Sequence, residues 1–502
     1  MMITTTDPST GILTDTDIEA TDDSQVATIA QTSDAAFRVL REHPRAWRAG
    51  LLRALAAGLE ANRAELVAIA RTETGLVTAR LEGELTRSVT QLSMFADVVD
   101  EGSYLEATID HAAQTPMGPG PDMRRMLVPI GPIAVFGSSN FPFAFSVPGG
   151  DTASALAAGN SVILKAHGSH PLTSRLAFDA LNTAATAYGA PAGTLGIVYG
   201  QRAGATLVAD PRVAAVGFTG SLATGRILLD IIEKREQPIP FYGELSSLNP
   251  LVVTPGAAAA RAEAIAEGLF ASVNGSAGQL CTKPGIAFVP AGPEGDGLVA
   301  TIAALGHGAA PQPLLNSRIL DAFSDIHGHL LDAPGVREIV ASATGAEGFS
   351  VGAAVLEVDA ADVTPAIAEE AFGPLIVLVR YRDFDEVARA LTAVPNSLTA
   401  TIHAEDDETD AIATLTDLFR DAVGRLVFNG YPTGVRVSWA QHHGGPWPAT
   451  NSLHTSVGMT AVRRFLRPLA WQNAPQSALP IELQDSEAGI PRRVDGKLYL
   501  AS

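Results

Sequence analysis

Four short apolar runs, separated by segments of helix length, constrain the fold of this chain more than any other feature. The runs do not alternate apolar with polar residues, which is typical of strands that are buried on both faces. Such strands belong to a parallel sheet covered by helices on both sides, that is, to an α/β fold. Ligands of these sheets bind at the carboxyl ends of the strands. The loops after the runs at 131–136, 161–164, 196–199 and 213–218 are therefore the place to look for function.

The segments that precede these runs differ in character. Residues 22–104 read as several amphipathic helices, with apolar positions spaced i, i+3 and i+4, as in 48–55. Residues 106–125 are rich in Pro, Gly and Met, and Pro and Gly break helices. We expect the first segment to be scaffold and the second to leave the main body as an interface arm.

Composition excludes several classes of function. The chain has 502 residues, enough for two or three domains, and a formal net charge of −20, so nucleic acid and anionic membranes would be repelled. A small molecule is the expected ligand. No segment is apolar enough to span a bilayer, and the acidic residues 1–31 lack the features of a secretory signal. The single cysteine excludes an intrachain disulfide framework, which fits a protein of the reducing cytoplasm.

Three loops that follow the predicted strands carry polar residues that the fold alone does not require. They are residues 137–143, 165–171 and 219–225. In the last loop, Gly220 and Ser221 open a helix, where backbone N–H groups and the helix dipole can bind a phosphate; a plain tight turn is an equal alternative.

Lysine is rare in this chain, which holds only Lys165, Lys234, Lys283 and Lys497. Lys165 ends a buried strand, which favours a contact with a ribose or phosphate over a plain surface position. His167 and His170 follow it, but they have no carboxylate or cysteine partner nearby in the sequence, so we predict no metal site.

The only cysteine, Cys281, lies in the glycine-containing stretch 274–283. A lone cysteine is often a buried, inert side chain. A nucleophilic cysteine instead needs partial exposure and close approach of a substrate, and the small residues around Cys281 favour this second interpretation.

Six motifs occur along the chain in a fixed order: Asn140-Phe141-Pro142, the Lys165 loop, Phe218-Thr219-Gly220-Ser221, Glu244-Leu245, Gly278-Gln279-Leu280-Cys281 and Glu370-Ala371-Phe372-Gly373-Pro374. In this order they resemble the aldehyde dehydrogenase superfamily, and the resemblance extends from about residue 30 to residue 475.

The resemblance implies an α/β subunit with the aldehyde dehydrogenase fold. Its parts would be a Rossmann-like cofactor domain, an α/β catalytic domain and a small bridging or oligomerisation part, assembled into a homodimer or homotetramer. In this sequence the cofactor domain would comprise residues 1–105 and 126–244, and the chain would return to it at 441–469. The catalytic domain would comprise residues 245–440, and the bridging part residues 106–125 and 470–502.

The implied reaction is the NAD(P)-dependent oxidation of an aldehyde to a carboxylic acid. The Cys281 thiolate would attack the aldehyde and form a thiohemiacetal, which becomes a thioester once a hydride has left. By resemblance, the Asn140 amide and the Cys281 N–H stabilise the oxyanion, and Glu244 is the base that activates water. By the same resemblance, Glu370 binds the nicotinamide ribose and Phe372 packs beneath the nicotinamide. The remaining cofactor contacts are Lys165, Gly220, Ser221 and Gly225.

Cofactor choice depends on the loop after Lys165. NAD-preferring relatives commonly have a glutamate where this chain has Gly168, and a carboxylate there would repel a 2′-phosphate. The Ser169 hydroxyl can donate to phosphate oxygens, and Arg202 in the next loop can reach the same group, although a plain surface arginine is an equal alternative. The sequence therefore favours NADP, with NAD possible.

Three stretches resemble more narrowly the branch that contains α-ketoglutaric semialdehyde dehydrogenases and certain bacterial fatty aldehyde dehydrogenases; they are residues 149–156, 428–435 and 443–450. The expected substrate is α-ketoglutaric semialdehyde. The alternatives are a medium- or long-chain fatty aldehyde, a non-catalytic homologue that keeps the fold, and a thiol esterase or acyltransferase, which would not need the cofactor loops.

The chain departs from the family at a few positions. Ser246 replaces a glycine beside the expected nicotinamide site, where its side chain would crowd the ring and slow turnover. Trp447 replaces a smaller aromatic residue, and the run 441–443, close to Arg436, is atypical. These departures concern the substrate more than the chemistry.

Overall fold

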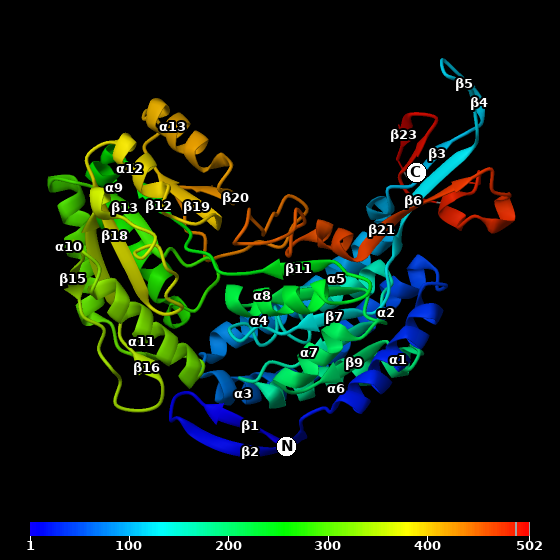
Figure 1. Ribbon diagram of the computed structural model, residues 1–502, viewed down its shortest axis with the longest axis horizontal. Helices are drawn as coiled ribbons and strands as arrows, with labels where there is room; N and C mark the ends of the chain where they lie inside the picture. Colours follow the sequence, from blue (N-terminus) through cyan, green and yellow to red (C-terminus); the bar gives the residue numbers. More distant parts are fainter. Residues whose placement is uncertain (487–488, 501–502) are drawn as a thin grey trace.

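The computed structural model describes residues 1–486 and 489–500. Figure 1 shows two α/β bodies side by side and a smaller sheet that projects from one of them. The α/β class predicted from the apolar runs is confirmed, because parallel strands dominate both large sheets. Residues 487–488 and 501–502 of the predicted bridging segment lie outside the described residues.

The first sheet is parallel throughout and has the strand order β11-β10-β7-β8-β9. Four of its strands coincide with the four apolar runs, and a fifth ends at Glu244. Since the chain moves outward from β7 in both directions, the loops after β7 and β10 open at a topological switch point, where such sheets bind ligands. The strands are β7 (Ile133–Phe136), β8 (Val162–Lys165), β9 (Leu195–Val198), β10 (Ala215–Thr219) and β11 (Phe241–Glu244).

Helices cover this sheet, as the sequence predicts for strands buried on both faces. They are α1 (Asp23–Leu40), α2 (Arg45–Ala61), α3 (Arg63–Thr74), α4 (Thr78–Glu101), α5 (Gly150–Ala158), α6 (Pro171–Tyr188), α7 (Gln201–Ala209) and α8 (Leu222–Glu233). The first helix starts where it does because Asp22 and Gln25 cap each other's backbone N–H groups.

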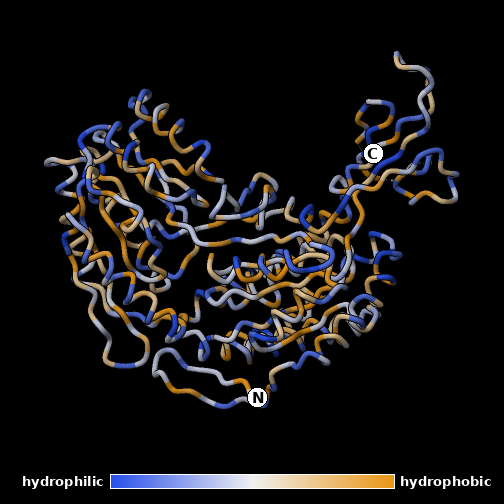
Figure 2. Tube along the Cα trace, in the orientation of Figure 1, coloured by the Kyte–Doolittle hydropathy of each residue, from blue (hydrophilic) through white to orange (hydrophobic). Residues whose placement is uncertain are grey.

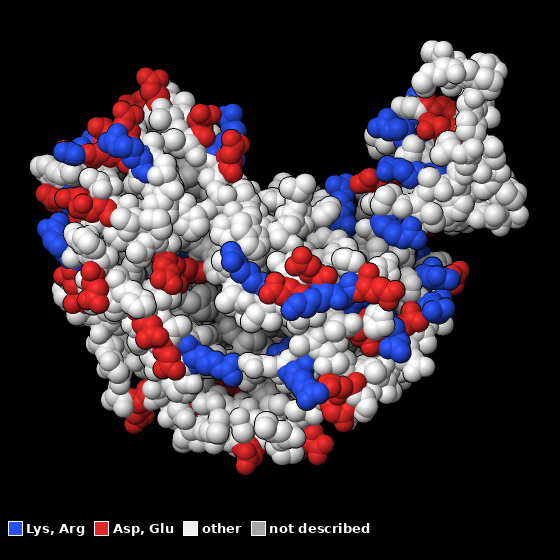
Figure 3. Space-filling model, in the orientation of Figure 1, with Lys and Arg blue, Asp and Glu red and all other residues white. Residues whose placement is uncertain are grey.

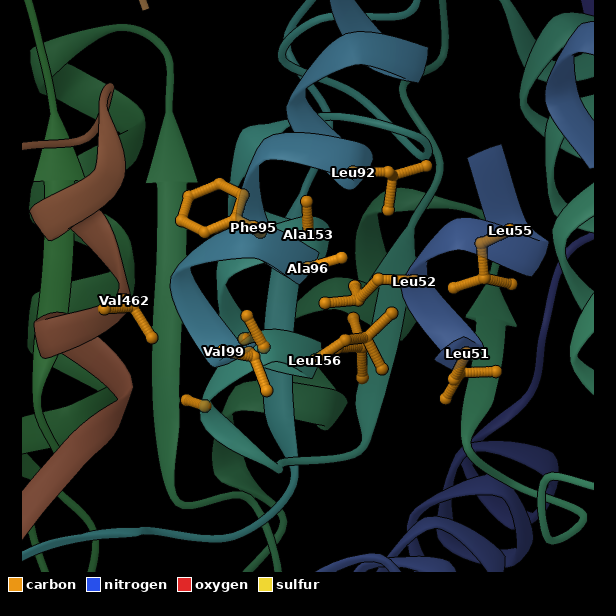
Figure 4. Close-up of a cluster of buried hydrophobic side chains, with 14 of the residues drawn as sticks. Leu51, Leu52, Leu55, Leu92, Phe95, Ala96, Val99, Ala153, Leu156 and Val462 are labelled. Atoms are coloured by element: carbon orange, nitrogen blue, oxygen red, sulfur yellow. The ribbon is translucent and has the colours of Figure 1, made fainter. Parts of the chain in front are cut away.

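The core of this body forms where α2, α4 and α5 meet the 3₁₀ segment η4 (Met459–Phe465). Figure 4 shows leucines of α2 against Phe95 and Val99 of α4, with Ala153 between them and Val462 beyond. Small residues on α5 let the helices approach closely, which accounts for the alanine-rich composition of this region.

The N-terminal residues form a hairpin that the sequence analysis did not predict. Its strands, β1 (Met2–Asp7) and β2 (Ile12–Glu19), pair antiparallel around Gly11, whose φ of 73° is left-handed. Thr5 donates a hydrogen bond of 2.7 Å to buried Glu73, and Glu73 also accepts from the backbone N–H of Thr173. The hairpin is thus fixed to the start of α6.

The second sheet has the order β15-β17-β18-β13-β12-β19-β20, with only β15 antiparallel to its neighbour. Its strands are β12 (Leu251–Val253), β13 (Ile286–Pro290), β15 (Arg337–Val340), β17 (Ala354–Asp359), β18 (Leu375–Tyr381), β19 (Ser397–His403) and β20 (Val423–Phe428); β14 (Gln312–Pro313) and β16 (Ser350–Val351) form a separate pair. The associated helices are α9 (Pro255–Asn274), α10 (Pro293–Gly308), α11 (Ser317–Leu331), α12 (Phe384–Leu391) and α13 (Thr409–Arg420).

The third sheet has the order β21-β6-β3-β22-β23, and Figure 1 shows it projecting from the first body with the β4–β5 hairpin at its tip. Its strands are β3 (Thr108–Asp110), β6 (Met123–Pro129), β21 (Leu466–Gln472), β22 (Arg492–Val494) and β23 (Lys497–Tyr499), and the hairpin consists of β4 (Ala113–Thr115) and β5 (Gly118–Gly120). The sheet extends past both predicted bridging boundaries, to residue 129 and back to 466; the division into domains stays a prediction.

Short 3₁₀ segments complete the fold: η1 (Ser103–Leu105), η2 (Gly275–Gly278), η3 (Ala360–Asp362), η5 (Gln476–Ala478) and η6 (Ile481–Leu483). Figure 2 shows apolar residues along the interior strands of both bodies, in agreement with their burial. On the face in Figure 3, acidic and basic side chains are interspersed. Within the described residues, no helix is both long enough and apolar enough to cross a membrane.

Candidate active site

The loop before Cys281 has an unusual backbone. Ser276 and Ala277 are left-handed, with φ of 55° and 53°, and Gly278 follows with φ of 67°. A Cβ at Gly278 would lie 2.1 Å from the carbonyl oxygen of Gly373, so only glycine fits there. Non-glycine residues adopt this conformation at an energetic cost, and such strain concentrates at functional sites.

Asn249 fixes the other side of this loop. Its side-chain nitrogen donates to the carbonyl oxygens of Cys281 at 2.9 Å and Lys283 at 3.0 Å. The buried Lys283 ammonium in turn donates to the carbonyl oxygens of Ala371 and Leu375, both at 2.9 Å. The nucleophile loop is therefore attached to the segment that carries Glu370.

His443 joins the two predicted catalytic residues Cys281 and Glu244. Its Nε2 lies 2.9 Å from Glu244 Oε1 and 3.7 Å from Cys281 Sγ, and all three ligand-type atoms lie within 4.8 Å of one another. Glu244 Oε2 accepts a 2.8 Å hydrogen bond from Ser456. A carboxylate only accepts hydrogen bonds, so Nε2 carries the proton that faces Glu244.

Electrostatics sets different resting states for these groups. Burial opposes ionisation of Glu244, but the charge and hydrogen bond of His443, aided by Ser456, hold the pKa of this carboxyl below its ordinary value. Burial raises the pKa of the Cys281 thiol well above its ordinary value, and the nearby Glu244 charge raises it further, while Arg87 opposes the shift. The site therefore rests as a carboxylate beside a thiol.

Asn140 follows β7 and lies against the cysteine loop. Its side-chain nitrogen donates to the Gln279 carbonyl oxygen at 2.9 Å, and its own carbonyl oxygen accepts from Arg80 at 2.7 Å. The predicted oxyanion donor is thus held two residues from Cys281 along the chain; its role in the reaction stays a prediction.

A cavity of about 210 Å³ opens at Cys281. Two arginines of α4 and two phenylalanines of the loop after β7 form one part of its wall. The lining residues are Arg80, Arg87, Phe141, Phe145, Ser276, Leu280, Cys281, Thr282, Thr433 and Val435.

The predicted cofactor residues lie at the carboxyl edge of the first sheet. Ser221 caps α8 by accepting from the Thr224 N–H, and a Cβ at Gly220 would lie 2.7 Å from the Phe218 ring. Gly225 is buried, and a Cβ there would lie 2.5 Å from Leu245, so the helix packs closely on the strand end. This is the geometry that a phosphate at a helix N-terminus requires.

Lys165 and its loop complete this edge. Burial, with a smaller effect of the Arg318 charge, lowers the pKa of Lys165 to about 8. Gly168 is exposed, and a Cβ on it would meet open space, so a ligand can approach the backbone there. The Ser169 hydroxyl accepts a 2.8 Å hydrogen bond from Asn316 and keeps its own proton to donate.

The histidines of this loop have hydrogen-bond partners. His170 Nε2 lies 2.8 Å from the Ser138 carbonyl oxygen, and His167 Nδ1 accepts from the Ser169 N–H at 3.1 Å. Both rings therefore form hydrogen bonds that hold the loop in place, which is a structural role and does not require a metal.

Arg202 is placed differently from the other predicted cofactor residues. It is the second residue of α7, its side chain is 82% exposed, and it forms an ion pair with Asp23 of α1. A cofactor phosphate would have to share or replace this partner. The structure thus leaves the phosphate role of Arg202 as a prediction.

Glu370 lies in the loop before β18 and accepts a 3.0 Å hydrogen bond from the Ser247 N–H. Burial raises the pKa of Glu370 to about 7, although the Lys283 charge opposes the shift. Phe372 is partly buried in the same loop.

The Ser246 hydroxyl, at the predicted departure from glycine, accepts from the Leu222 N–H at 3.3 Å and so faces the start of α8.

Trp447 and Arg436 lie at the surface, whereas His443 of the atypical run 441–443 is buried in the site. Trp447 is 43% exposed, and the Arg226 guanidinium lies 5.7 Å from its ring centroid. Arg436 is exposed.

Sequence reasoning missed four residues of this site. His443 was noted only as part of an atypical run, and Asn249 and Ser456 have no local pattern that marks them. Arg87 had a usable signal, because a charged residue at i+7 from Arg80 and i+3 from Glu84 puts three charges on one face of a helix that otherwise buries leucines.

The chain belongs to the aldehyde dehydrogenase family: the family's sequence profile, described as "Aldehyde dehydrogenase family", matches residues 1–446. It is therefore an NAD(P)-dependent aldehyde dehydrogenase, as the motifs predicted, and the predicted fold class and enzyme class are confirmed. These matches support the dehydrogenase over the esterase and the non-catalytic alternatives.

Among known proteins, the chain is 46% identical over 471 residues to alpha-ketoglutaric semialdehyde dehydrogenase 2 of Azospirillum brasilense, covering 92% of this chain and 89% of the relative. It is 39% identical over 484 residues to alpha-ketoglutaric semialdehyde dehydrogenase of Acinetobacter baylyi, covering 94% and 91%.

Solved structures share the fold. A crystal structure of PnpE in complex with nicotinamide adenine dinucleotide superposes with a TM-score of 0.81 at 22% identity, over 94% of both chains. A crystal structure of NADP-dependent glyceraldehyde-3-phosphate dehydrogenase from Bacillus halodurans complexed with NADP gives a TM-score of 0.80 at 22% identity, over 94% of this chain and 96% of that one.

Proposed function

We propose that this protein oxidises a short aldehyde with a carboxylate at its far end, namely α-ketoglutaric semialdehyde, to the corresponding acid. The observation that carries the proposal is the contact of His443 Nε2 with both Glu244 and Cys281 at the cavity of about 210 Å³. The substrate is supported by the names of the relatives at 46% and 39% identity.

Glu244 takes up the thiol proton, since its pKa is held below the ordinary value and its carboxylate lies within 4.8 Å of Cys281 Sγ. The Nε2–H of His443 then faces the thiolate, which attacks the aldehyde carbon. Asn140 and the Cys281 N–H receive the developing oxyanion. Glu244 releases the thiol proton to solvent before hydrolysis, and its carboxylate then removes a proton from the water that attacks the thioester, so that the acid leaves Cys281.

The residues present fit a nicotinamide dinucleotide. The N-terminus of α8 offers backbone N–H groups beside Gly220, Lys165 offers an ammonium, and Glu370 offers a carboxylate to hydroxyl groups. A bound nicotinamide would supply the hydride acceptor for the oxidation at Cys281.

NADP is the proposed cofactor, supported by the absence of a carboxylate at Gly168 and by the donors Ser169 and Arg202. The test is to measure KM for NADP and NAD in wild type, Arg202→Ala and Asp23→Asn. We expect NADP binding to weaken roughly tenfold or more in Arg202→Ala with NAD unchanged, and to strengthen in Asp23→Asn, which frees the guanidinium. Equal effects on both cofactors, or a wild-type preference for NAD, contradict the choice.

The substrate test compares kcat/KM for α-ketoglutaric semialdehyde with that for hexanal and octanal. A clear preference for the semialdehyde is expected. A strong preference for the aliphatic aldehydes would instead assign the protein to the fatty aldehyde dehydrogenases, the second candidate named by the sequence.

We further propose that the protein works as a cytoplasmic homodimer or homotetramer, assembled through the third sheet. The support is the projecting position of this sheet and the exposed side chains of its edge strand β23. Light scattering coupled to gel filtration measures the mass. A monomer at working concentration contradicts this proposal.

A further inference from the structure

Helix α4 carries three charged side chains beside the substrate cavity, and two of them line it. Arg80, Glu84 and Arg87 stand at i, i+4 and i+7, so they share one face of the helix. Both arginines line the cavity beside Cys281, whereas Glu84 is buried behind them. This face therefore brings two positive charges and one negative charge to the site.

Arg80 and Glu84 have structural partners. Arg80 donates to the Asn140 carbonyl oxygen at 2.7 Å and to the Ser276 hydroxyl, and lies 3.6 Å from Glu84. Glu84 accepts from the backbone N–H groups of Phe143 and Ala144 at 2.8 and 2.9 Å. These two side chains hold together the loops that carry Asn140 and Cys281.

Arg87 has no such partner. Its Nε and Nη2 are inaccessible to solvent and have no hydrogen-bond partner among residues 1–486 and 489–500. Its guanidinium lies over the ring of Phe145, 5.0 Å from the centroid. A cation–π contact orients the guanidinium without using its N–H donors. A buried guanidinium with unused donors is costly to keep, and the cost is recovered only when an acceptor arrives.

We propose that Arg87 binds the distal carboxylate of the aldehyde substrate and thereby selects a semialdehyde with a carboxylate over a neutral aldehyde. The proposal rests on the proposed function and names the residue that recognises this substrate class. The guanidinium presents N–H donors in a planar fork that matches a carboxylate, and the cavity joins it to Cys281, so one short molecule can contact both.

A rival role for Arg87 is to stabilise the Cys281 thiolate, because its charge lowers the pKa of that thiol against the effects of burial and Glu244. The two roles predict different kinetics. Thiolate stabilisation acts on every aldehyde alike, whereas carboxylate binding acts only on substrates that carry one.

The test measures kcat/KM for α-ketoglutaric semialdehyde and for pentanal, which has the same number of carbons and no charge. In Arg87→Gln the ratio of the two values should fall about 10- to 100-fold, the range of a charge-assisted hydrogen bond. Arg87→Lys should retain part of the ratio, because an ammonium keeps the charge but not the fork. The control is Arg53→Gln, which replaces an exposed arginine of α2 that pairs with Asp97 of α4, and it should keep the wild-type ratio.

A second measurement needs no turnover. Cys281 is the only thiol in the chain, so iodoacetamide labels one position. 2-Oxopentanoate, the substrate skeleton without its aldehyde oxygen, should slow this labelling in wild type and not in Arg87→Gln, while 2-pentanone should protect neither.

The outcomes separate the two proposals. A wild type that shows no preference for the semialdehyde overturns the proposed substrate and this inference with it. If the wild type prefers the semialdehyde, and Arg87→Gln keeps both the wild-type kcat/KM ratio and the protection of Cys281 by 2-oxopentanoate, only the inference about Arg87 is overturned. A loss of equal size for both substrates assigns Arg87 to the thiolate and likewise overturns it.

Discussion

Replacing His443 tests the central contact of the site. The change His443→Phe keeps a buried ring but removes the nitrogen that lies 2.9 Å from Glu244 and 3.7 Å from Cys281. Glu244 is then left with Ser456 as its side-chain hydrogen-bond donor. Loss of one partner of a buried ionic hydrogen bond costs about 3–5 kcal/mol of stability, and loss of a group that assists proton transfer lowers rates about 10²- to 10⁴-fold.

The pH dependence has a definite sign. In the wild type, His443 is the main group that lowers the pKa of Glu244 against burial. Without it burial dominates, the pKa of Glu244 rises, and the carboxylate form is lost at higher pH than before. The acid limb of kcat should therefore move to higher pH in His443→Phe, in addition to the drop in rate.

The assay is the pH profile of steady-state NADP reduction, with thermal unfolding measured in parallel. His442→Phe serves as the control, because its ring lies next in sequence without a hydrogen bond to Glu244 or Cys281 among the described residues. An unchanged rate with an unchanged acid limb in His443→Phe would refute the reasoning.

Other expected outcomes follow from the same geometry. Glu244→Gln should give a burst of reduced cofactor followed by slow turnover, because the thioester lacks a base; an unchanged steady-state rate rules this role out. Stoichiometric alkylation of Cys281 should abolish dehydrogenase activity, and a fully labelled enzyme that turns over excludes the nucleophile assignment. Gly278→Ala should lose activity and at least about 1–2 kcal/mol of stability, because alanine disfavours φ of 67° and its Cβ would meet Gly373, whereas Gly275→Ala, with open space and an ordinary φ, should behave like wild type. Arg80→Gln should lower kcat/KM for the semialdehyde and pentanal by the same factor, since Arg80 holds Asn140, and a selective loss contradicts that positioning role.

The sequence predicts the first sheet well because its evidence is local. Runs such as 131–136 and 213–218 are buried on both faces, and that requirement alone produces an unbroken apolar stretch. The hairpin at residues 2–19 was not predicted, because its largely exposed strands are stabilised by contacts with distant residues, such as Thr5 with Glu73 and Asp17 with Arg175, and these leave no pattern along the chain.

The same difference between local patterns and contacts of distant residues decides which site residues could be predicted. Cys281 and Glu244 were identified because each lies in a motif of adjacent residues. His443 lies 199 positions from Glu244 along the chain, and only the packing of the 443–450 loop against the end of β11 brings the two together. Arg87 was taken as scaffold because a helix pattern shows which residues are charged and does not show that a cavity lies opposite them.

The scarcity of lysine has a chemical consequence for an enzyme that handles aldehydes. Primary amines condense with aldehydes to Schiff bases, whereas the guanidinium of arginine stays protonated. Of the four lysines, Lys283 is enclosed by two carbonyl oxygens and Lys165 is largely buried, so Lys234 at the end of α8 and Lys497 in β23 are the exposed side-chain amines. The protein therefore exposes few amines that can react with its aldehyde substrate. Schiff-base adducts should accumulate at Lys234 and Lys497, which lie far from Cys281 along the chain.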